Sequence, residues 1–245
     1  MASTRKPAGK VSASRGLIED LVAASRILAQ HEVLDAYGHV SARSDRRPER
    51  FVMSRAIAPA LVKVADLVEH GADSEALAGD ARKGFIERYI HGEIYRSRPE
   101  VMAIVHSHAA SVIPFGVTRT KLRPIYHMGS FLWSGTPVFD IRNIRKENDL
   151  LIRDRSLGEA LAASLGACNC VLMRGHGMTV VGQNVPEAVY RAIYTEMNAR
   201  LQLQATLLEG PIEFLSDEEG RRATKANQGT LERPWELWKK QILKK

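Results

Sequence analysis

The spacing of apolar and polar positions along the chain predicts helices in several places. Apolar residues recur at helical intervals over residues 15–30 and again over 84–97, where the pattern ends at Arg98-Pro99. Ser156 with Glu159 forms a capping-box pattern at the start of a third helix. The predicted helices cover residues 15–30, 84–97, 156–165, 184–209 and a short stretch from Ser216, with one further turn within residues 59–69.

Short apolar runs bounded by polar turns predict the strands. The run Val101–Val105 has no polar residue and is typical of a strand that is buried on both faces. The other predicted strands cover residues 37–43, 51–54, 123–126, 137–140, 171–173 and 178–181. Strands are more frequent than a βαβ alternation would give, and helices gather towards both ends. We therefore expect an α/β fold, a layered domain with a mostly antiparallel central sheet.

Composition narrows the class of protein. At 245 residues, 44% hydrophobic and 26% charged, the chain fits one globular domain, predicted over residues 15–245 with a C-terminal helical tail. Residues 1–14 are basic and predict a disordered arm. No apolar run approaches the ~18 residues of a membrane helix, so no membrane association is expected. Cys168 and Cys170 are the two cysteines of the sequence, too few for a disulfide framework, and this favours a reducing cytoplasm.

The net charge of +7 favours an anionic partner. Nucleic acid is not the expected one, because only 6% of residues are aromatic and the basic residues are scattered. A small anionic substrate fits the same charge.

Three histidines and a glutamate are the candidates for metal chemistry. His106 and His108 are two positions apart at the end of the Val101–Val105 run, so their side chains are expected on the same face. His176 lies in a glycine-bracketed turn between two predicted strands. Three imidazoles with an oxygen ligand suit a divalent Zn, Mn, Fe or Co ion. Glu87 is the candidate oxygen ligand, and the alternative is a solvated carboxylate paired with His91.

These residues resemble the class II aldolase/adducin family over about residues 17–210. The resemblance rests on Glu87 with His91, on residues 94–100, on Val105-His106-Ser107-His108 and on Gly175-His176-Gly177. It implies a three-layer α/β/α fold and a divalent metal held by His106, His108 and His176, with Glu87 as a ligand or acid–base group. It also implies a homotetramer with active sites at subunit interfaces.

Within that family, the sequence departs from the sugar-phosphate aldolases. Their Ser pair before the metal-site Glu is replaced by Phe85-Ile86, which cannot hydrogen-bond a phosphate. The Gly-Asn pair that the aldolases have near their first strand is replaced in this sequence by Gly38-His39. The chain instead resembles the decarboxylase branch, which includes the 3,4-dihydroxyphthalate decarboxylases and the 3-hydroxy-2-methylpyridine-4,5-dicarboxylate decarboxylase. The expected reaction is the metal-dependent conversion of 3,4-dihydroxyphthalate to protocatechuate and CO2.

Three alternatives stay open at this point: the pyridine dicarboxylate as substrate, a class II aldolase acting on a hydroxy-carbonyl substrate, and a non-catalytic scaffold as in adducin. The candidate catalytic residues are Glu87, Tyr194 and His127. The candidate substrate-binding residues are His39, Ser41, Ser54, Arg55, Phe85 and Arg191. Arg191 has a surface salt bridge as its alternative, and Tyr194 has simple core packing.

Overall fold

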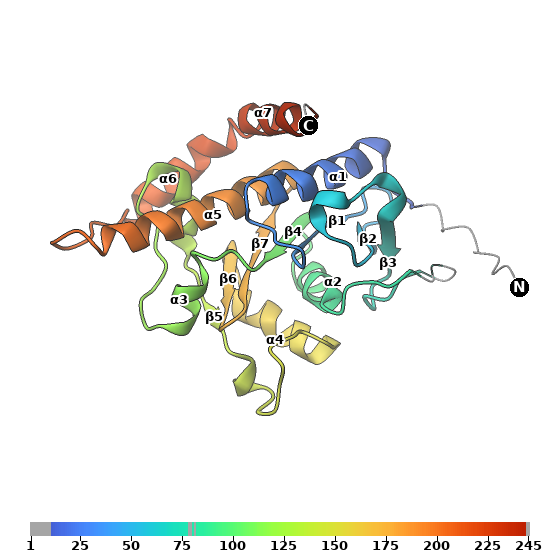
Figure 1. Ribbon diagram of the computed structural model, residues 1–245, viewed down its shortest axis with the longest axis horizontal. Coiled ribbons are helices and arrows are strands. Elements are labelled where there is room, and N and C mark those ends of the chain that lie inside the picture. The colour runs from blue at the N-terminus through green and yellow to red at the C-terminus, as the bar shows by residue number, and fades with distance from the viewer. Residues whose placement is uncertain (1–10, 78–79, 81, 244–245) are drawn as a thin grey trace, which may run out of the picture.

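The computed structural model describes residues 11–77, 80 and 82–243, and its centre is a sheet. In these residues the sheet has seven strands in the order β3-β2-β1-β4-β7-β6-β5 (Figure 1). Every neighbouring pair is antiparallel except β5 with β6, so the predicted mostly antiparallel sheet is confirmed. The strands are β1 (His39–Arg43), β2 (Phe51–Ser54), β3 (Leu67–His70), β4 (Ala103–Ser107), β5 (Val138–Phe139), β6 (Cys170–Met173) and β7 (Gly177–Gly182).

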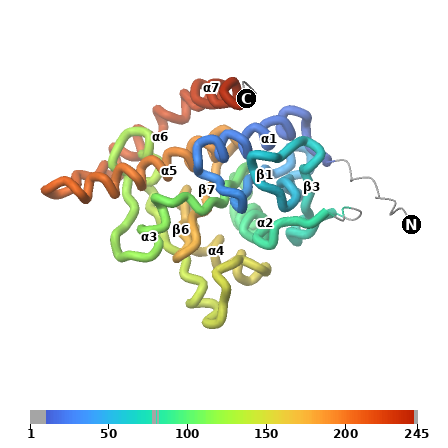
Figure 2. Tube along the Cα trace, viewed as in Figure 1, coloured from blue at the N-terminus to red at the C-terminus, as the bar shows by residue number. Residues whose placement is uncertain are grey.

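Helices cover both faces of this sheet and complete three layers (Figures 1 and 2). One face carries α1 and α5, with α7 above them, and the other carries α2 and α4. The α-helices are α1 (Arg15–Gln30), α2 (Arg88–Ser97), α3 (Ile113–Val117), α4 (Arg155–Leu165), α5 (Val185–Ala205), α6 (Asp217–Gln228) and α7 (Glu232–Leu243). The predicted three-layer α/β/α fold is therefore what the chain adopts.

Strand β4 lies in the middle of the sheet and explains the apolar run that predicted it. All of its residues are buried. Ala103 and Val105 pack into the core beneath α1 and α5, whereas Ile104 packs into the core beneath α2 and α4. His106 shares the parity of Ile104, so its side chain lies on the face of α2.

Several predicted boundaries are corrected. Helix α2 begins at Arg88, not at 84, and Glu87 is its N-cap residue. Asp154, not Ser156, caps α4, because its side chain accepts the backbone N–H of Leu157. The turn of helix predicted within 59–69 is limited to two short 3₁₀ segments, and strand β3 follows them.

The strand predicted at 123–126 does not form. Its backbone is hydrogen-bonded to side chains of α5 in place of a neighbouring strand. Asn198 accepts the N–H of Ile125 and donates to the carbonyl of Arg123, and Gln202 accepts the N–H of Arg123. Two amide side chains therefore satisfy the groups that a sheet would otherwise pair.

Of the predicted disordered arm, residues 1–10 lie outside the described residues. Residues 11–14 are ordered, which corrects the prediction for them. The N–H of Ser12 donates to Glu69 of β3, Ser44 donates to the carbonyl of Ser12, and Ala13 is buried. Among the described residues, no helix is both long and apolar enough to cross a membrane.

Candidate metal centre

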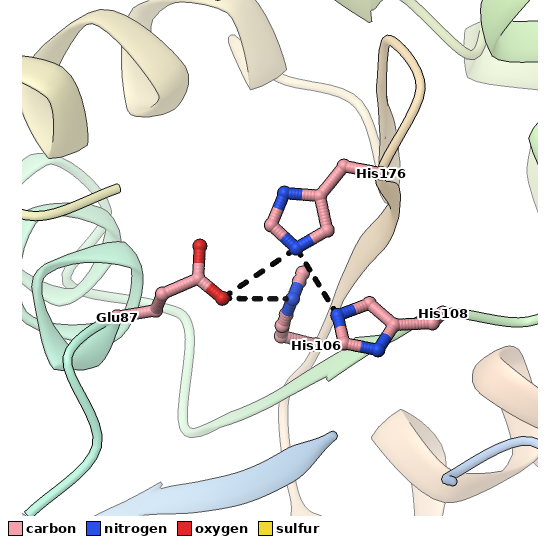
Figure 3. A group of neighbouring side chains, drawn as sticks. All are labelled: Glu87, His106, His108 and His176. Atoms are coloured by element: carbon pink, nitrogen blue, oxygen red, sulfur yellow. Dashed lines mark hydrogen bonds and ion pairs between the residues drawn. The ribbon is translucent and has the colours of Figure 1, made fainter. Parts of the chain in front are cut away.

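Three histidines and one glutamate meet at the end of strand β4 (Figure 3). Glu87 comes from the N-terminus of α2, His106 from β4, His108 from the segment after β4, and His176 from the turn between β6 and β7. One ligand atom from each of the four lies within 4.8 Å of the others. The Nε2 atoms of His108 and His176 are 3.1 Å apart, and Glu87 Oε2 is 3.5 Å from Nε2 of both His106 and His176.

The pairing of β4 with β7 places the His176 turn against the two other histidines. His106 lies opposite Thr179 in this ladder. At Gly177, where β7 begins, a Cβ atom would lie 2.0 Å from the carbonyl oxygen of Ser107, so only glycine permits this approach. Gly175, in the same turn, has a φ of 65°. The glycines on either side of His176 thus serve the geometry that brings it to β4.

Each histidine is oriented by a hydrogen bond from its Nδ1. His106 donates to the carbonyl of Met178 at 3.1 Å, and His176 donates to the carbonyl of Leu150 at 2.9 Å. His108 donates to Oδ2 of Asp35 at 2.9 Å. With the proton on Nδ1, each neutral ring presents the lone pair of Nε2, the form that ligates a metal.

The four residues fit a divalent metal. Nε2 of His106 is buried and has no hydrogen-bond partner among the described residues. An unpartnered buried nitrogen lone pair is costly unless a cation or proton meets it. Three imidazole nitrogens and one carboxylate oxygen are a donor set that Zn, Mn, Fe and Co all accept.

The charges of the cluster are coupled. Burial alone would raise the pKa of the Glu87 carboxyl, but His106 and His176 hold it well below its usual range. Burial lowers the pKa of His106. The pKa of His176 is raised, because the hydrogen bond and charge of Glu87 outweigh the effect of its burial. Glu87 is therefore ionised, and it is the charge that favours a cation at this point.

A single loop holds two members of the cluster. The N–H of Ile152 donates to Oε1 of Glu87 at 3.0 Å, while the carbonyl of Leu150 accepts from His176. Leu150 has a φ of 68°, a left-handed conformation that is unfavourable for a leucine. This conformation lets one short loop present an acceptor and a donor to two different residues of the site.

The cluster opens into a cavity of about 770 Å³. Three of its members, Glu87, His108 and His176, line this cavity. Most of the remaining wall is apolar, and Lys83 adds a positive charge to it. The other lining residues include Tyr37, His39, Ile57, Phe85, Ile86, Leu150 and Leu151. A volume of this size accommodates a small aromatic molecule beside the four residues.

Two of the predicted substrate-binding residues line the cavity, and one lies directly behind it. His39 and Phe85 are in the wall, with ring centroids 4.5 Å apart. Ser41 is fully buried and hydrogen-bonds His91 and Tyr95. The alternative pairing of Glu87 with His91 is not formed, because His91 bonds His39 and Ser41 in its place.

The structure does not bring the other predicted residues to this cavity. Ser54 is buried in β2, and the guanidinium of Arg55 pairs with Asp66 at 2.7 Å. Arg191 is buried, and it donates to the carbonyl of Val181 and to Glu187, four residues earlier on the same helix. It therefore does not reach the cavity, and its salt bridge is a buried one in place of the surface salt bridge that was the alternative.

The two remaining candidate catalytic residues also lie elsewhere. Tyr194 packs against Tyr190, with ring centroids 4.5 Å apart, and against Trp238 of α7. His127 is exposed, and its carbonyl accepts from Asn227. Within one chain, therefore, Glu87 is the only one of the three that faces the cavity in the described residues.

Sequence reasoning missed the residues that support the cluster. Asp35, Leu150 and Ile152 act through a carboxylate or through backbone groups, and a backbone contact leaves no sign in side-chain type. Lys83 lies four residues before Glu87 in the sequence, and the structure places both residues in the wall of the same cavity.

The family model described as the Class II Aldolase and Adducin N-terminal domain matches residues 19–203, well over half of the chain. The chain belongs to the class II aldolase and adducin family.

Its relatives narrow the branch. The chain is 41% identical to decarboxylase tropJ of Talaromyces stipitatus, over 92% of this chain and 93% of that protein. It is 32% identical to a 3,4-dihydroxyphthalate decarboxylase of Terrabacter sp., over 82% of this chain and 85% of that protein. L-fuculose 1-phosphate aldolase from Glaciozyma antarctica PI12 has a TM-score of 0.76 at 22% identity, covering 93% and 88% of the two chains, and shows the shared fold. The sequence thus falls in the decarboxylase branch of the family.

Proposed function

We propose that this protein is a metal-dependent decarboxylase of a small hydroxylated aromatic dicarboxylate, and that 3,4-dihydroxyphthalate is the substrate, giving protocatechuate and CO2. The observation that carries the proposal is a three-histidine, one-glutamate cluster in the wall of a mainly apolar cavity. The names of the relatives support the reaction type.

The cavity wall suits an aromatic ring better than a phosphorylated sugar. Phe85 and Ile86 occupy the position before Glu87, and Ile57, Leu150 and Leu151 extend the apolar surface. None of these side chains can hydrogen-bond a phosphate oxygen, whereas all can pack on a ring. The apolar part of the wall therefore favours the decarboxylase over the aldolase alternative.

Lys83 is the residue we assign to the second carboxylate of the substrate. The two arginines among the predicted substrate-binding residues, Arg55 and Arg191, have guanidinium groups that pair with Asp66 and Glu187. Lys83 lines the cavity, and an ammonium group on a flexible stem can follow a carboxylate across it.

Glu87 is the residue we assign to proton transfer. In the reaction, the bond between the ring and its carboxylate breaks, CO2 leaves, and a proton takes the vacated ring position. Oε1 of Glu87 is fixed by the N–H of Ile152, so both roles of the carboxylate fall to Oε2, which faces His106 and His176. We assign to Oε2 the acceptance of the ring hydroxyl proton and the return of a proton to the ring carbon.

His106, His108 and His176, with Glu87, would hold the metal. When bound, the divalent cation supplies positive charge that stabilises the electron pair left as CO2 departs. The histidines themselves keep their Nε2 lone pairs directed inward through their Nδ1 hydrogen bonds. The homotetramer that the family resemblance implies stays a prediction.

A matched assay tests the proposal. Metal-loaded and chelator-treated protein are given 3,4-dihydroxyphthalate, 3-hydroxy-2-methylpyridine-4,5-dicarboxylate or L-fuculose 1-phosphate, with CO2 and aldehyde followed in parallel. We expect CO2 from 3,4-dihydroxyphthalate, lost with the metal and in His106→Ala. Preference for the pyridine would correct the substrate. Aldehyde without CO2 would overturn the decarboxylase proposal.

A further inference from the structure

A buried chain of polar side chains runs from the cavity wall into the protein. Nδ1 of His39 lies 2.7 Å from Nε2 of His91, whose Nδ1 lies 2.6 Å from Oγ of Ser41. Oγ of Ser41 is in turn 2.8 Å from the hydroxyl of Tyr95. His91 and Ser41 are fully buried, and His39 and Tyr95 are 3% and 5% exposed. None of these four side chains has a role in the function proposed above.

Both imidazoles in the chain are neutral. Each is buried, and no carboxylate hydrogen-bonds either ring among the described residues. A neutral imidazole carries one N–H, and a serine hydroxyl can donate one hydrogen bond and accept two. Three proton arrangements are therefore possible: every bond is donated in the direction from Tyr95 to His39, every bond is donated in the reverse direction, or Ser41 accepts from both Tyr95 and His91.

The two buried hydroxyl protons decide among them. The Tyr95 hydroxyl has Ser41 as its hydrogen-bond partner and no other among the described residues. If Ser41 donated to Tyr95, the tyrosine proton would be buried without an acceptor, which is the costly outcome for a buried polar group. The Tyr95 hydroxyl therefore donates to Ser41.

The remaining protons follow from that choice. Ser41 donates to Nδ1 of His91, because its own buried proton would otherwise have no acceptor. His91 then carries its proton on Nε2 and donates it to Nδ1 of His39. The His39 proton is left on Nε2, which makes no hydrogen bond to any described residue, and the His39 side chain lines the cavity.

We propose that Tyr95, Ser41 and His91 are positioning residues that hold His39 as the Nε2–H tautomer, a hydrogen-bond donor into the cavity. The group it takes is an anionic or neutral oxygen acceptor on the ligand, such as a carboxylate or a ring oxygen. In assigning that oxygen to the substrate, the inference rests on the proposed function. The direction in which the buried hydrogen bonds are donated does not depend on that function.

The ring of His39 is placed for this task. It packs against Phe85 on the cavity side, and its centroid is 5.0 Å from that of His106. His39 and His106 lie opposite each other in the antiparallel pairing of β1 with β4. A ligand that lies on Phe85 beside the metal-binding residues would therefore meet the His39 N–H. The donor selects oxygen atoms near the cluster and would not interact favourably with an apolar substituent there.

The first experiment determines the tautomers directly. Zinc-loaded protein with ¹⁵N-labelled histidine is examined by long-range ¹H–¹⁵N correlation, with His39 and His91 assigned from the signals lost in His39→Gln and His91→Gln. We expect both rings as Nε2–H tautomers. Both rings as Nδ1–H tautomers would reverse the chain and overturn the inference.

The second experiment measures the consequence for binding. In Ser41→Ala we expect a mixed His39 tautomer and roughly fivefold weaker binding of 3,4-dihydroxybenzoate, with the zinc content unchanged. Tyr89→Phe is the control, because it removes a hydroxyl that bonds Glu75 and no member of the buried hydrogen-bond chain. It should change neither the His39 tautomer nor the binding of 3,4-dihydroxybenzoate.

Two further outcomes are decisive. If His39→Leu binds 3,4-dihydroxybenzoate as tightly as the unmodified protein, the donor role is wrong. If the unmodified protein does not bind this probe, the substrate class proposed above fails, and the tautomer measurement alone still decides the direction of the chain.

Discussion

Oε1 of Glu87 accepts the backbone N–H of Ile152 at 3.0 Å, across 65 positions of sequence. This bond fixes the orientation of the one carboxylate in the metal cluster, and it leaves the second oxygen facing His106 and His176. The proposed proton transfer and metal binding both depend on that second oxygen, so the bond gives the clearest way to separate charge from geometry at this site.

Glu87→Gln keeps the oxygen that accepts from Ile152 and removes the charge. We expect a loss of roughly 10²- to 10⁴-fold in the rate of CO2 release, because proton transfer is lost while the side-chain shape is kept. The rate is measured at saturating metal, with Glu75→Gln on the surface as the control. A variant with an unchanged rate would remove Glu87 from the reaction.

Asp35→Asn tests the orientation of His108. The Oδ1 atom of Asp35 accepts from the N–H groups of Tyr37 and Gly38, and an Asn oxygen can keep both bonds. Its amide N–H₂ would then face the Nδ1–H of His108, two donors in opposition. We expect metal affinity to fall by about 10- to 100-fold in a competition titration. Asp73→Asn, which is exposed, should bind metal normally.

Lys83→Met tests the assignment of the second carboxylate. We expect KM for a dicarboxylate substrate to rise by about tenfold, with kcat little changed, because the lost ion pair forms equally in the ground and transition states. A monocarboxylate analogue should be less affected by the substitution. Lys225→Met on the exposed face of α6 is the matched control, and an equal effect in both variants would contradict the assignment.

Gly177→Ala should destabilise the fold. The added Cβ would lie 2.0 Å from the carbonyl oxygen of Ser107, where neither backbone can move without breaking the β4–β7 ladder. We expect a loss of about 3 kcal/mol in the free energy of unfolding, measured with denaturant. At Gly229 the added Cβ would lie 3.6 Å from its nearest neighbour, so Gly229→Ala should be close to neutral.

His70 should make stability depend on pH. Burial lowers the pKa of this histidine to about 4, and its ring stacks on Phe51. The unfolded chain takes up this proton near pH 6.5 and the folded chain only near pH 4. Between those values the unfolded state binds more protons, so stability contributed by His70 is complete above pH 6.5 and falls as the pH is lowered.

The size of that effect is up to roughly 3 kcal/mol. Comparing thermal unfolding of the unmodified protein with His70→Phe between pH 4 and 7 isolates it from the other histidines. We expect a shallower decline in the variant, and the same comparison for the exposed His127→Phe should show no difference. Parallel curves for His70→Phe and the unmodified protein would show that His70 is protonated equally in both states.

The comparison of sequence with structure separates two kinds of information. His106, His108 and His176 were predictable because their spacing, and the glycines beside His176, are local features that fix geometry over a few residues. The layered fold was predictable for the same reason, from apolar spacing. The full burial of His70 was not predicted, because strand β3, which contains it, was not among the predicted strands.

Long-range partners account for the other differences. Asn198 and Gln202 bind the backbone where a strand was predicted at residues 123–126, and nothing in that segment shows that amide side chains of α5 will do so. Arg191 is different, because Glu187 lies one helical turn before it and the pair could have been expected from the sequence.

The left-handed loop residue Leu150 gives the site a thermodynamic property. Its side chain lines the cavity, while its carbonyl holds His176. A ligand that displaces this loop must change the affinity for the metal, and by linkage the metal must change the affinity for the ligand by the same factor. Filling the cavity and loading the ion are then two coupled equilibria, joined through one backbone carbonyl.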